Sequence, residues 1–440
     1  MQKLKENKIL FQFLRYASLN VLGMIGLSCY ILADTFFIAK GLGSNGLAAL
    51  NIAIPVYSFI YGLGLMCGIG AATRYAILKQ NKESKQTNSV FTQSVMFVLM
   101  LSAIFFSLGL FLSKEISTLL GASDAIVGIT NTYLRIILLF APIFMLNELI
   151  LCFVRNDGNP RLAMISMLIG SLSNIILDYI FVIKLGTGMT GAALATGIAP
   201  VVGLIVSSMH FIKKRNNFKF VKTRLRLAAI KDMISLGTGA LVNELSSGIV
   251  IIVFNFVILR IAGDIGVAAY AIIANIAVVV VSIFTGIAQG MQPLVSSNYG
   301  KGNKEGVVKT YRYGLITAIS FATIIYLIAF FLAEPITAVF NEENNAKLTE
   351  IAVYGIRIYF TAIAFVGINI ITSIFFSSID KPKQAVTISL LRAFLLIVPI
   401  TITMATLFSM TGVWLSLLIS EVITLIISMT LYYKNKKQMA

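Results

Sequence analysis

Acidic residues inside long apolar stretches are the features of this sequence that could do chemistry. Five such residues stand out: Asp34, Glu148, Asp178, Glu244 and Glu421. A charge at the centre of a bilayer costs roughly 2.5 to 3.5 kcal/mol on insertion scales, so an acid placed there needs a partner or a function. Carboxylates can bind a hard cation, carry a proton or attract a cationic ligand. These five residues are therefore the first candidates for a functional site.

The composition predicts that the segments carrying these acids cross a membrane. Of 440 residues, 58% are hydrophobic and only 12% are charged, whereas charged residues make up about 25% of a typical soluble protein. Scanning for apolar runs of roughly 20 residues, the length that crosses a bilayer, predicts twelve spans. They cover residues 14–38, 47–78, 89–112, 128–153, 162–183, 190–212, 232–259, 266–297, 310–332, 350–376, 384–407 and 411–433.

Basic residues in the loops predict how the chain is oriented. Assigned alternately to the two sides, the loops carry 24 Lys and Arg on one side and five on the other, with eight of the 24 between residues 213 and 231. This asymmetry places both termini in the cytoplasm of a multi-pass plasma-membrane protein. The net charge of +17 is therefore assigned to membrane orientation and not to nucleic-acid binding. A composition rich in Lys, Asn and Ile suggests a bacterial source.

The two halves of the chain repeat one another. Gly43, Gly46 and Gly70 recur 220 residues later, and Met189-Thr190-Gly191 returns as Met410-Thr411-Gly412. The predicted domains are an amino-terminal lobe of six helices (1–212), a basic cytoplasmic linker (213–231) and a second six-helix lobe (232–440). Because six is even, the lobes are predicted to be parallel bundles in an all-α fold, related by a pseudo-two-fold axis along the membrane normal. This organisation is typical of transporters, although channels also contain repeats.

Asp34 and Asp178 form the most informative pair of acids. Both lie near the outer ends of spans that run in the same direction, so they are expected at similar depth and able to meet. Asn174 precedes Asp178 by four residues and shares its helix face, as Tyr30 does with Asp34. Thr196 on the next span adds a hydroxyl. Carboxylate, amide and hydroxyl oxygens are ligands that hard cations prefer.

The repeat indicates that this cluster is specific to one half. The counterparts of Asp34, Asn174, Asp178 and Thr196 in the second half are all apolar: Phe254, Leu396, Ile400 and Leu417. Two carboxylates in one pocket cannot both ionise cheaply unless a cation lies between them, so the site could take Na⁺ or H⁺. The alternative is that both acids only hydrogen-bond neighbouring helices.

The remaining acids are less well defined by the sequence. Glu244, whose repeat partner is Met24, could meet a cationic substrate or a second proton, and a hydrogen bond between helices is an open alternative. Glu148 is more typical of an ion-paired or snorkelling acid. The sequence does not decide the role of Glu421. His210, at a predicted cytoplasmic helix end, has no visible partner.

Several motifs together resemble the multidrug and toxic compound extrusion (MATE) transporters over the whole chain. The motifs are Asp34-Thr-Phe-Phe-Ile, Gly43-Ser-Asn-Gly-Leu-Ala-Ala-Leu, Arg155-Asn-Asp-Gly-Asn-Pro, Ser173-Asn174-Ile-Ile-Leu-Asp178 and Gly191-Ala-Ala-Leu-Ala-Thr196. The resemblance implies a cation site made by Asp34, Asn174, Asp178 and Thr196. Some family members add a Glu on the seventh span, which Glu244 resembles, and an Asp on the tenth, where this chain has Asn369 and no carboxylate.

The resemblance implies an antiporter that exports cationic, amphipathic drugs and toxins by alternating access, with Na⁺ favoured over H⁺ as the coupling ion. No enzyme activity, no cofactor beyond that ion and no nucleic-acid partner are expected. We expect a monomer in the lipid bilayer. The alternative is a flippase for a lipid-linked precursor, which would need basic groups inside the membrane to bind pyrophosphate. The mid-membrane charges of this chain are mainly acidic.

Overall fold

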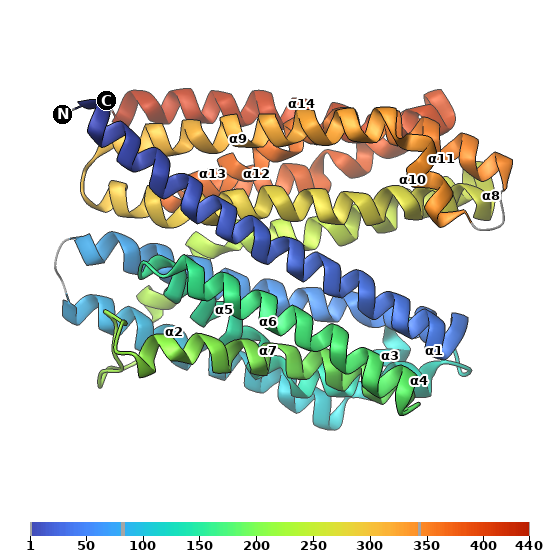
Figure 1. Cartoon of the computed structure of the whole chain (residues 1–440), viewed down its shortest axis with the longest axis horizontal. Coiled ribbons are helices and arrows are strands. Elements are labelled where there is room, and N and C mark those ends of the chain that lie inside the picture. Colours follow the sequence, from blue (N-terminus) through green and yellow to red (C-terminus); the bar gives the residue numbers. More distant parts are fainter. Residues whose placement is uncertain (1, 81–83, 342–344, 440) are drawn as a thin grey trace. The chain divides into compact units, whose positions relative to one another are not determined.

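The computed structural model describes residues 2–80, 84–341 and 345–439. Throughout this part the chain is helical, with short connections and no strand (Figure 1). Apolar side chains occupy most positions of these helices, and the helical backbone satisfies its own hydrogen bonds. A helix can therefore cross a bilayer without unpaired polar groups.

Three of the helices are interrupted by one non-helical residue each. α1 (Gln2–Gln80) breaks at Gly43 (φ 66°, ψ −156°) and α8 (Leu227–Gly300) breaks at Gly263 (φ 61°, ψ −158°). These two glycines are the repeat partners identified in the sequence, and a residue without Cβ adopts this backbone conformation at little cost. α14 (Ile397–Met439) breaks at Ser409 (φ 52°, ψ −136°). The backbone thus repeats the same break in both halves.

The interruptions account for the number of membrane spans. Within the described residues, 8 helical stretches are long and apolar enough to cross a membrane. A ninth arises when α4 (Val127–Leu139) and α5 (Ala141–Asn156), bent by 47°, are taken as one span. Three of these stretches contain the breaks at Gly43, Gly263 and Ser409 and therefore cross twice. The predicted all-α fold with twelve membrane helices is confirmed.

The remaining helices are short or single spans that begin at residues suited to a helix start. Asn159 caps α6, Asn303 caps α9 and Asn345 caps α11, in each case with a side-chain oxygen that accepts a backbone N–H. The further elements are α2 (Ser84–Phe111), α3 (Ser113–Leu119), α6 (Pro160–Asp178), η1 (Tyr179–Lys184), α7 (Gly188–Ile212), α9 (Lys304–Phe331), α10 (Ala333–Phe340), α11 (Ala346–Tyr359), η2 (Phe360–Ala362), α12 (Ile363–Ser378), α13 (Pro382–Leu390) and η3 (Leu391–Leu395).

By contacts, the chain divides into two units. The amino-terminal unit comprises Leu22–Leu241, and the carboxyl-terminal unit comprises Met1–Val21 together with Val242–Ala440. The start of α1 therefore packs within the second unit, where a Cβ added to Gly290 would lie 2.7 Å from the Cα of Ala17. In the amino-terminal unit, a Cβ on its repeat partner Gly70 would lie 2.0 Å from the carbonyl oxygen of Met233. Glycine at both positions lets two helix backbones approach closely.

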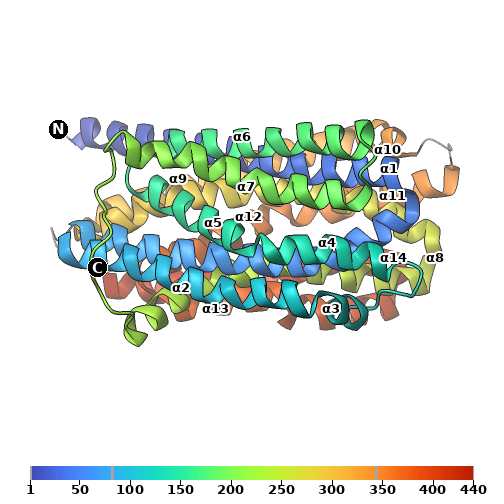
Figure 2. The same cartoon turned by 90° about the horizontal axis from the view of Figure 1, so that it is seen from below.

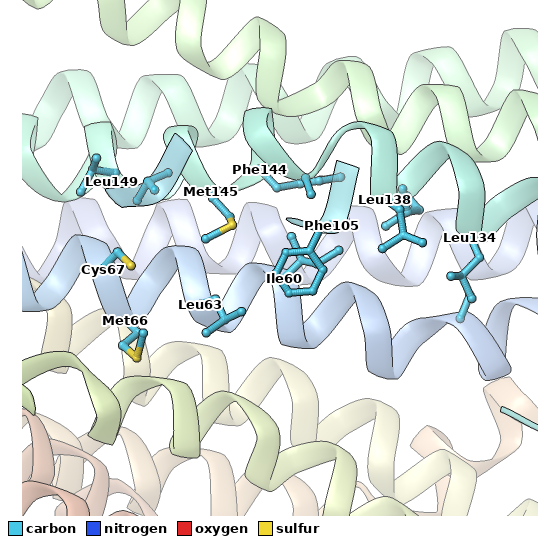
Figure 3. Close-up of a cluster of buried hydrophobic side chains, with 14 of the residues drawn as sticks. Ile60, Leu63, Met66, Cys67, Phe105, Leu134, Leu138, Phe144, Met145 and Leu149 are labelled. Atoms are coloured by element: carbon cyan, nitrogen blue, oxygen red, sulfur yellow. The ribbon is translucent and has the colours of Figure 1, made fainter. Parts of the chain in front are cut away.

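A continuous hydrophobic core holds the amino-terminal unit together. Ile60, Met145 and Leu149 are among its fully buried members, and Phe144 and Phe105 fill the space beside them (Figure 3). The side chains of this core come mainly from α1, α2, α4, α5 and α7, so the core packs these helices of the unit against one another.

The segment that follows α7 packs on the amino-terminal unit. The backbone N–H groups of Lys219, Val221 and Arg226 donate to side chains of α2, at Asn88 Oδ1 (2.9 Å), Thr92 Oγ1 (3.1 Å) and Gln93 Oε1 (2.9 Å). Phe218 is fully buried among aromatic rings of the unit. This part of the linker is therefore fixed to the amino-terminal unit.

Asp157, at the end of α5, joins the linker to two helix ends. Its carboxylate accepts hydrogen bonds from the hydroxyl of Tyr75 (2.5 Å), from Lys79 Nζ (2.5 Å) and from both nitrogens of Asn217 (2.8 and 2.9 Å). His210 Nε2 lies 2.9 Å from Oδ2 of the same carboxylate. The expectation that His210 lacks a partner is therefore wrong, because the carboxylate that it meets is contributed by a distant helix end.

Candidate functional site

Asp34, Asn174, Asp178 and Thr196 lie together inside the amino-terminal unit. Asp34 comes from α1, Asn174 and Asp178 come from α6, and Thr196 comes from α7. All four side chains are buried, Asn174 and Asp178 completely. Helices α6 and α7 run side by side (Figures 1 and 2), which brings Thr196 next to Asn174. The predicted meeting of these residues is observed; their role as a cation site stays a prediction.

The four residues lie in one chain of close polar groups. The carboxyl groups of Asp34 and Asp178 lie near each other. The amide of Asn174 is oriented by its neighbours, so that its nitrogen donates to Asp178 Oδ2 at 3.0 Å and its oxygen accepts from the backbone N–H of Thr196 at 3.3 Å. Since carboxylates only accept hydrogen bonds, the two acids can share a hydrogen bond only when one of them carries a proton.

Three oxygens of the cluster have unused hydrogen-bonding capacity. Asp34 Oδ1, Asp178 Oδ1 and Thr196 Oγ1 are buried without a hydrogen-bond partner among the described residues. A buried oxygen left unpaired is energetically unfavourable. A cation placed among these atoms would satisfy them, and oxygen is the ligand atom that hard cations prefer. The donor set therefore fits Na⁺ as well as a shared proton.

The helix changes geometry directly after Asp178. Residues Tyr179–Lys184 form the π-helical segment η1, which continues α6 without a break. One extra residue in a turn rotates the following side chains by about 100°. Asp178 thus lies at the last regular turn, and π-helical turns occur frequently at functional sites.

Tyr30 links the cluster to an internal cavity. It lies one turn before Asp34, and its hydroxyl is 2.6 Å from that of Tyr57. Both rings line a cavity of about 50 Å³, together with Asn147 and Glu148. The lining is mainly apolar, and the side chains of Tyr30, Tyr57, Asn147 and Glu148 supply polar groups to it. A cavity of this size has room for water beside those groups. The predicted supporting residue Tyr30 therefore lies one helix turn from Asp34 and lines this cavity.

The other predicted acids lie apart from this cluster. Glu148 lines the far side of the cavity, where the side-chain nitrogen of Asn147 lies 3.4 Å from it. Glu244 is half-buried on α8 in the carboxyl-terminal unit, and its predicted contact with a substrate or a second proton stays a prediction. Glu421 belongs to a buried ion pair with Arg392 in the same unit.

Arg392 is the residue that sequence reasoning missed. Its presence inside the apolar run 384–407 was a usable signal, because a basic residue within a span carries the same energetic cost as an acid. When only the acidic residues of the spans are considered, and not the basic ones, Glu421 has no predicted partner.

The comparisons with known proteins agree with this fold. The MatE family profile matches residues 21–180 and 240–403, once in each half. A curated relative, the multidrug export protein MepA of Staphylococcus saprophyticus, is 25% identical over 410 residues, which cover 92% of this chain and 89% of the relative.

Solved structures share the fold. A structure described as the outward-facing conformation of a multidrug resistance MATE family transporter has a TM-score of 0.91 and 22% identity, and the match covers 98% of this chain and 96% of that one. A transporter of the MOP superfamily from Pyrococcus furiosus, whose description reports reverse polarity of the binding pocket, has a TM-score of 0.90 with the same identity and coverage. At this identity the structures establish the fold alone. With the profile matching both halves, the chain belongs to the MatE family of multi-pass membrane transporters.

Proposed function

We propose that this chain exports cationic, amphipathic drugs and toxins from the cytoplasm in exchange for a cation, by alternating access. The observation that carries this proposal is the buried cluster of Asp34, Asp178 and Thr196, which has three oxygens without partners. An unsatisfied acidic cluster inside a membrane protein is best explained by a ligand that comes and goes. The name of the relative MepA, a multidrug export protein, supports the substrate class.

Na⁺ is the favoured coupling ion, and H⁺ is the alternative at the same atoms. A hydrogen bond between the neighbouring carboxyl groups of Asp34 and Asp178 would require a proton on one of them, whereas Na⁺ among the three oxygens without partners requires both acids ionised. Binding of Na⁺ therefore displaces the shared proton. The two states carry the same net charge, because two carboxylates with one proton and two carboxylates with one Na⁺ both total −1. They differ in the ion that is bound and in the distance that the carboxylates prefer, which suits a device that links ion binding to conformation.

The charge of the substrate decides how much energy one ion contributes to export. A single charge moving inward through a potential of 100 mV releases about 2.3 kcal/mol, and about 1.4 kcal/mol corresponds to a tenfold concentration ratio, so one ion supports a roughly fortyfold gradient of an uncharged substrate. Exchange of one cation for one monovalent cationic substrate moves no net charge, so the chemical gradient of the ion drives that exchange.

The flippase alternative is disfavoured by the buried charges. A lipid pyrophosphate would need basic groups free to bind it. Arg392 is a buried Arg within a membrane helix, and its guanidinium is already engaged by Glu421 and Asn243. The amino-terminal cluster contributes further negative charge, which would repel a pyrophosphate.

Efflux of ethidium tests the proposal. Proteoliposomes or cells containing the chain should lose ethidium faster when an inward Na⁺ gradient is imposed, and Asp34→Asn should reduce efflux to the level of protein-free controls. Asparagine keeps the size of the side chain but removes the charge that the cation needs. Imposing only a pH gradient in the same vesicles separates H⁺ from Na⁺ coupling.

Asp124→Asn is the matched control, because Asp124 is an exposed carboxylate in the turn before α4. This variant should export ethidium as the unmodified chain does. Equal ethidium retention with and without the chain, under both gradients, would contradict drug export. Transbilayer movement of a labelled lipid pyrophosphate under those conditions would favour the flippase.

A further inference from the structure

The carboxyl-terminal unit contains a buried ion pair that the proposed transport function does not use. Glu421 of α14 accepts a hydrogen bond from Arg392 Nε at both carboxylate oxygens, at 2.9 and 3.1 Å. Asn369 of α12 donates to the same carboxylate at 2.7 Å. The side chains of Arg392 and Glu421 are only 7% and 4% exposed. A charged pair so deeply buried within membrane helices is costly and calls for a function.

Arg392 is held from two sides. Its second nitrogen, Nη1, donates to Asn243 Oδ1 on α8 at 3.2 Å. Arg392 lies in the π-helical segment η3, which interrupts the regular helix between α13 and α14. Asn369 is itself oriented by Ser428, whose hydroxyl donates to its oxygen at 3.1 Å. The cluster therefore joins α8, η3, α12 and α14 through one guanidinium and one carboxylate.

The two units differ in how their buried carboxylates are neutralised. In the amino-terminal unit, Asp34 and Asp178 pair with no basic side chain among the described residues, and each retains an oxygen without a partner. In the carboxyl-terminal unit, both oxygens of Glu421 are occupied by fixed donors. One unit thus needs a positive charge from solution, whereas the other carries its own.

We propose that the guanidinium of Arg392 is the resident cation of a second acidic site, which it fills permanently, so that a mobile cation binds only in the amino-terminal unit. A charge attached to a helix cannot dissociate, so this site does not exchange ions during transport. The inference rests on the proposed cation coupling for its meaning in transport, but its chemistry can be tested separately. Its ligand class is a monovalent cation, Na⁺ or H⁺, admitted only when Arg392 is removed.

Removing the guanidinium should convert the filled site into an open one. Arg392→Met keeps much of the side-chain length but leaves Glu421 with only Asn369 as donor. Asn369 of α12 still donates to Glu421, and Tyr359 at the end of α11 lies near enough to interact electrostatically with it. Neither supplies a positive charge. A buried carboxylate without a counter-charge takes up a proton or a metal cation.

The experiment measures thermal unfolding of the full chain in detergent, in an Asp34→Asn background that removes the first site. Asp34→Asn alone should show the same melting temperature in choline chloride and in NaCl. The melting temperature of Asp34→Asn/Arg392→Met should rise by about 3 °C or more when NaCl is added or when the pH is lowered from about 8 to about 5. The reason is that Na⁺ or a proton then neutralises the Glu421 carboxylate, which lacks a counter-charge.

Adding Glu421→Gln to that variant is the matched control. Without the carboxylate, the change in melting temperature with Na⁺ and with pH should return to that of Asp34→Asn. The variant Arg392→Lys keeps a positive charge, so its melting temperature should not respond to Na⁺ or to pH in this way. A response that persists after Glu421→Gln, or no response in the Arg392→Met variant, would overturn the proposal. If the Arg392→Met protein folds poorly, purification at high NaCl or low pH should rescue it; failure to rescue it would also count against the resident cation.

The two proposals fail in different ways. If melting of the unmodified chain does not depend on Na⁺ or on Asp34, the amino-terminal cation site is wrong, while the comparison between the Arg392→Met and Glu421→Gln variants still decides the second site.

Discussion

At the scale of single residues, the buried carboxylates of this protein differ in how completely hydrogen bonds and ion pairs satisfy them. Asp34 and Asp178 are left incompletely satisfied within the membrane helices, whereas Glu421 is fully satisfied by Arg392. Asp157 lies outside the spans, at the end of α5, and its carboxylate accepts hydrogen bonds from α1, α7 and the linker. Unsatisfied buried charge marks a site for a mobile ligand, and satisfied buried charge marks a structural connection.

The charge of Asp157 should stabilise the fold in a pH-dependent way. Burial by itself raises the pKa of this carboxyl, but the hydrogen bonds that it accepts outweigh burial and lower the pKa from 3.8 to about 2. Because the folded pKa lies below the unfolded one, the stabilisation is present above about pH 4 and is lost as the pH falls towards 2. Asp157→Asn should lower the free energy of unfolding by about 2 kcal/mol at pH 7.

Thermal unfolding in detergent measures this effect. The difference in melting temperature between the unmodified chain and Asp157→Asn should shrink between about pH 4 and about pH 2. Asp124→Asn, at an exposed carboxylate, should leave the melting temperature unchanged. A difference for Asp157→Asn that is as large at the acidic end of this range as at neutral pH would show that the charge is not the cause.

At the scale of helices, the same break occurs in both halves with different residues. Gly188, with φ 64°, is the first residue of α7. Its repeat partner is Ser409, which adopts φ 52° and ψ −136° within α14. A side chain with a Cβ rarely adopts this conformation, and the strain costs about 1 to 2 kcal/mol. At this position the second half therefore keeps the positive φ of the first half, but with serine in place of glycine.

Ser409→Gly should relieve this strain. We expect it to raise the free energy of unfolding by about 1 kcal/mol, since glycine adopts positive φ without steric cost. The melting temperature of the purified variant measures the gain. Ser409→Ala is the control, because alanine keeps the Cβ and should give no gain. An equal increase in both variants would point to the loss of the hydroxyl as the cause.

At the scale of the whole molecule, the distribution of basic residues predicts the orientation in the membrane. The linker between Lys213 and Lys231 carries eight Lys and Arg, all of them exposed. We propose that this linker and both termini face the cytoplasm. The turn before α4, which contains Asp124, would then face outward.

Labelling of single cysteines tests this orientation. Starting from a variant in which Cys29, Cys67 and Cys152 are replaced by Ser or Ala, a membrane-impermeant maleimide should label Asp124→Cys on intact cells. Lys222→Cys should be labelled only after the membrane is made permeable. The opposite pattern would reverse the orientation and, with it, the direction proposed for transport.

Much of the fold could be predicted from the sequence because a bilayer imposes simple rules. A span must be apolar over about 20 residues, so twelve spans could be counted from the order of residues alone. The breaks at Gly43 and Gly263 fall between predicted spans, within residues 39–46 and 260–265, and the same backbone conformation favours the same residue in both halves. The predicted spans 384–407 and 411–433 also place a boundary at the break near Ser409. The residue type of Ser409 did not indicate its positive φ, because serine is compatible with an uninterrupted helix.

The sequence by itself determined which residues carry buried charge, and the spacing of Asn174 and Asp178 placed both on one helix face. Only the tertiary structure decided how each charge is balanced. Arg392 lies 29 residues from Glu421, and His210 lies 53 residues from Asp157, so neither pairing follows from local spacing. The balance depends on which side chains the packed helices bring within hydrogen-bond distance. That is why Asp34 and Asp178 each have a buried oxygen without a hydrogen-bond partner, whereas both oxygens of Glu421 accept hydrogen bonds.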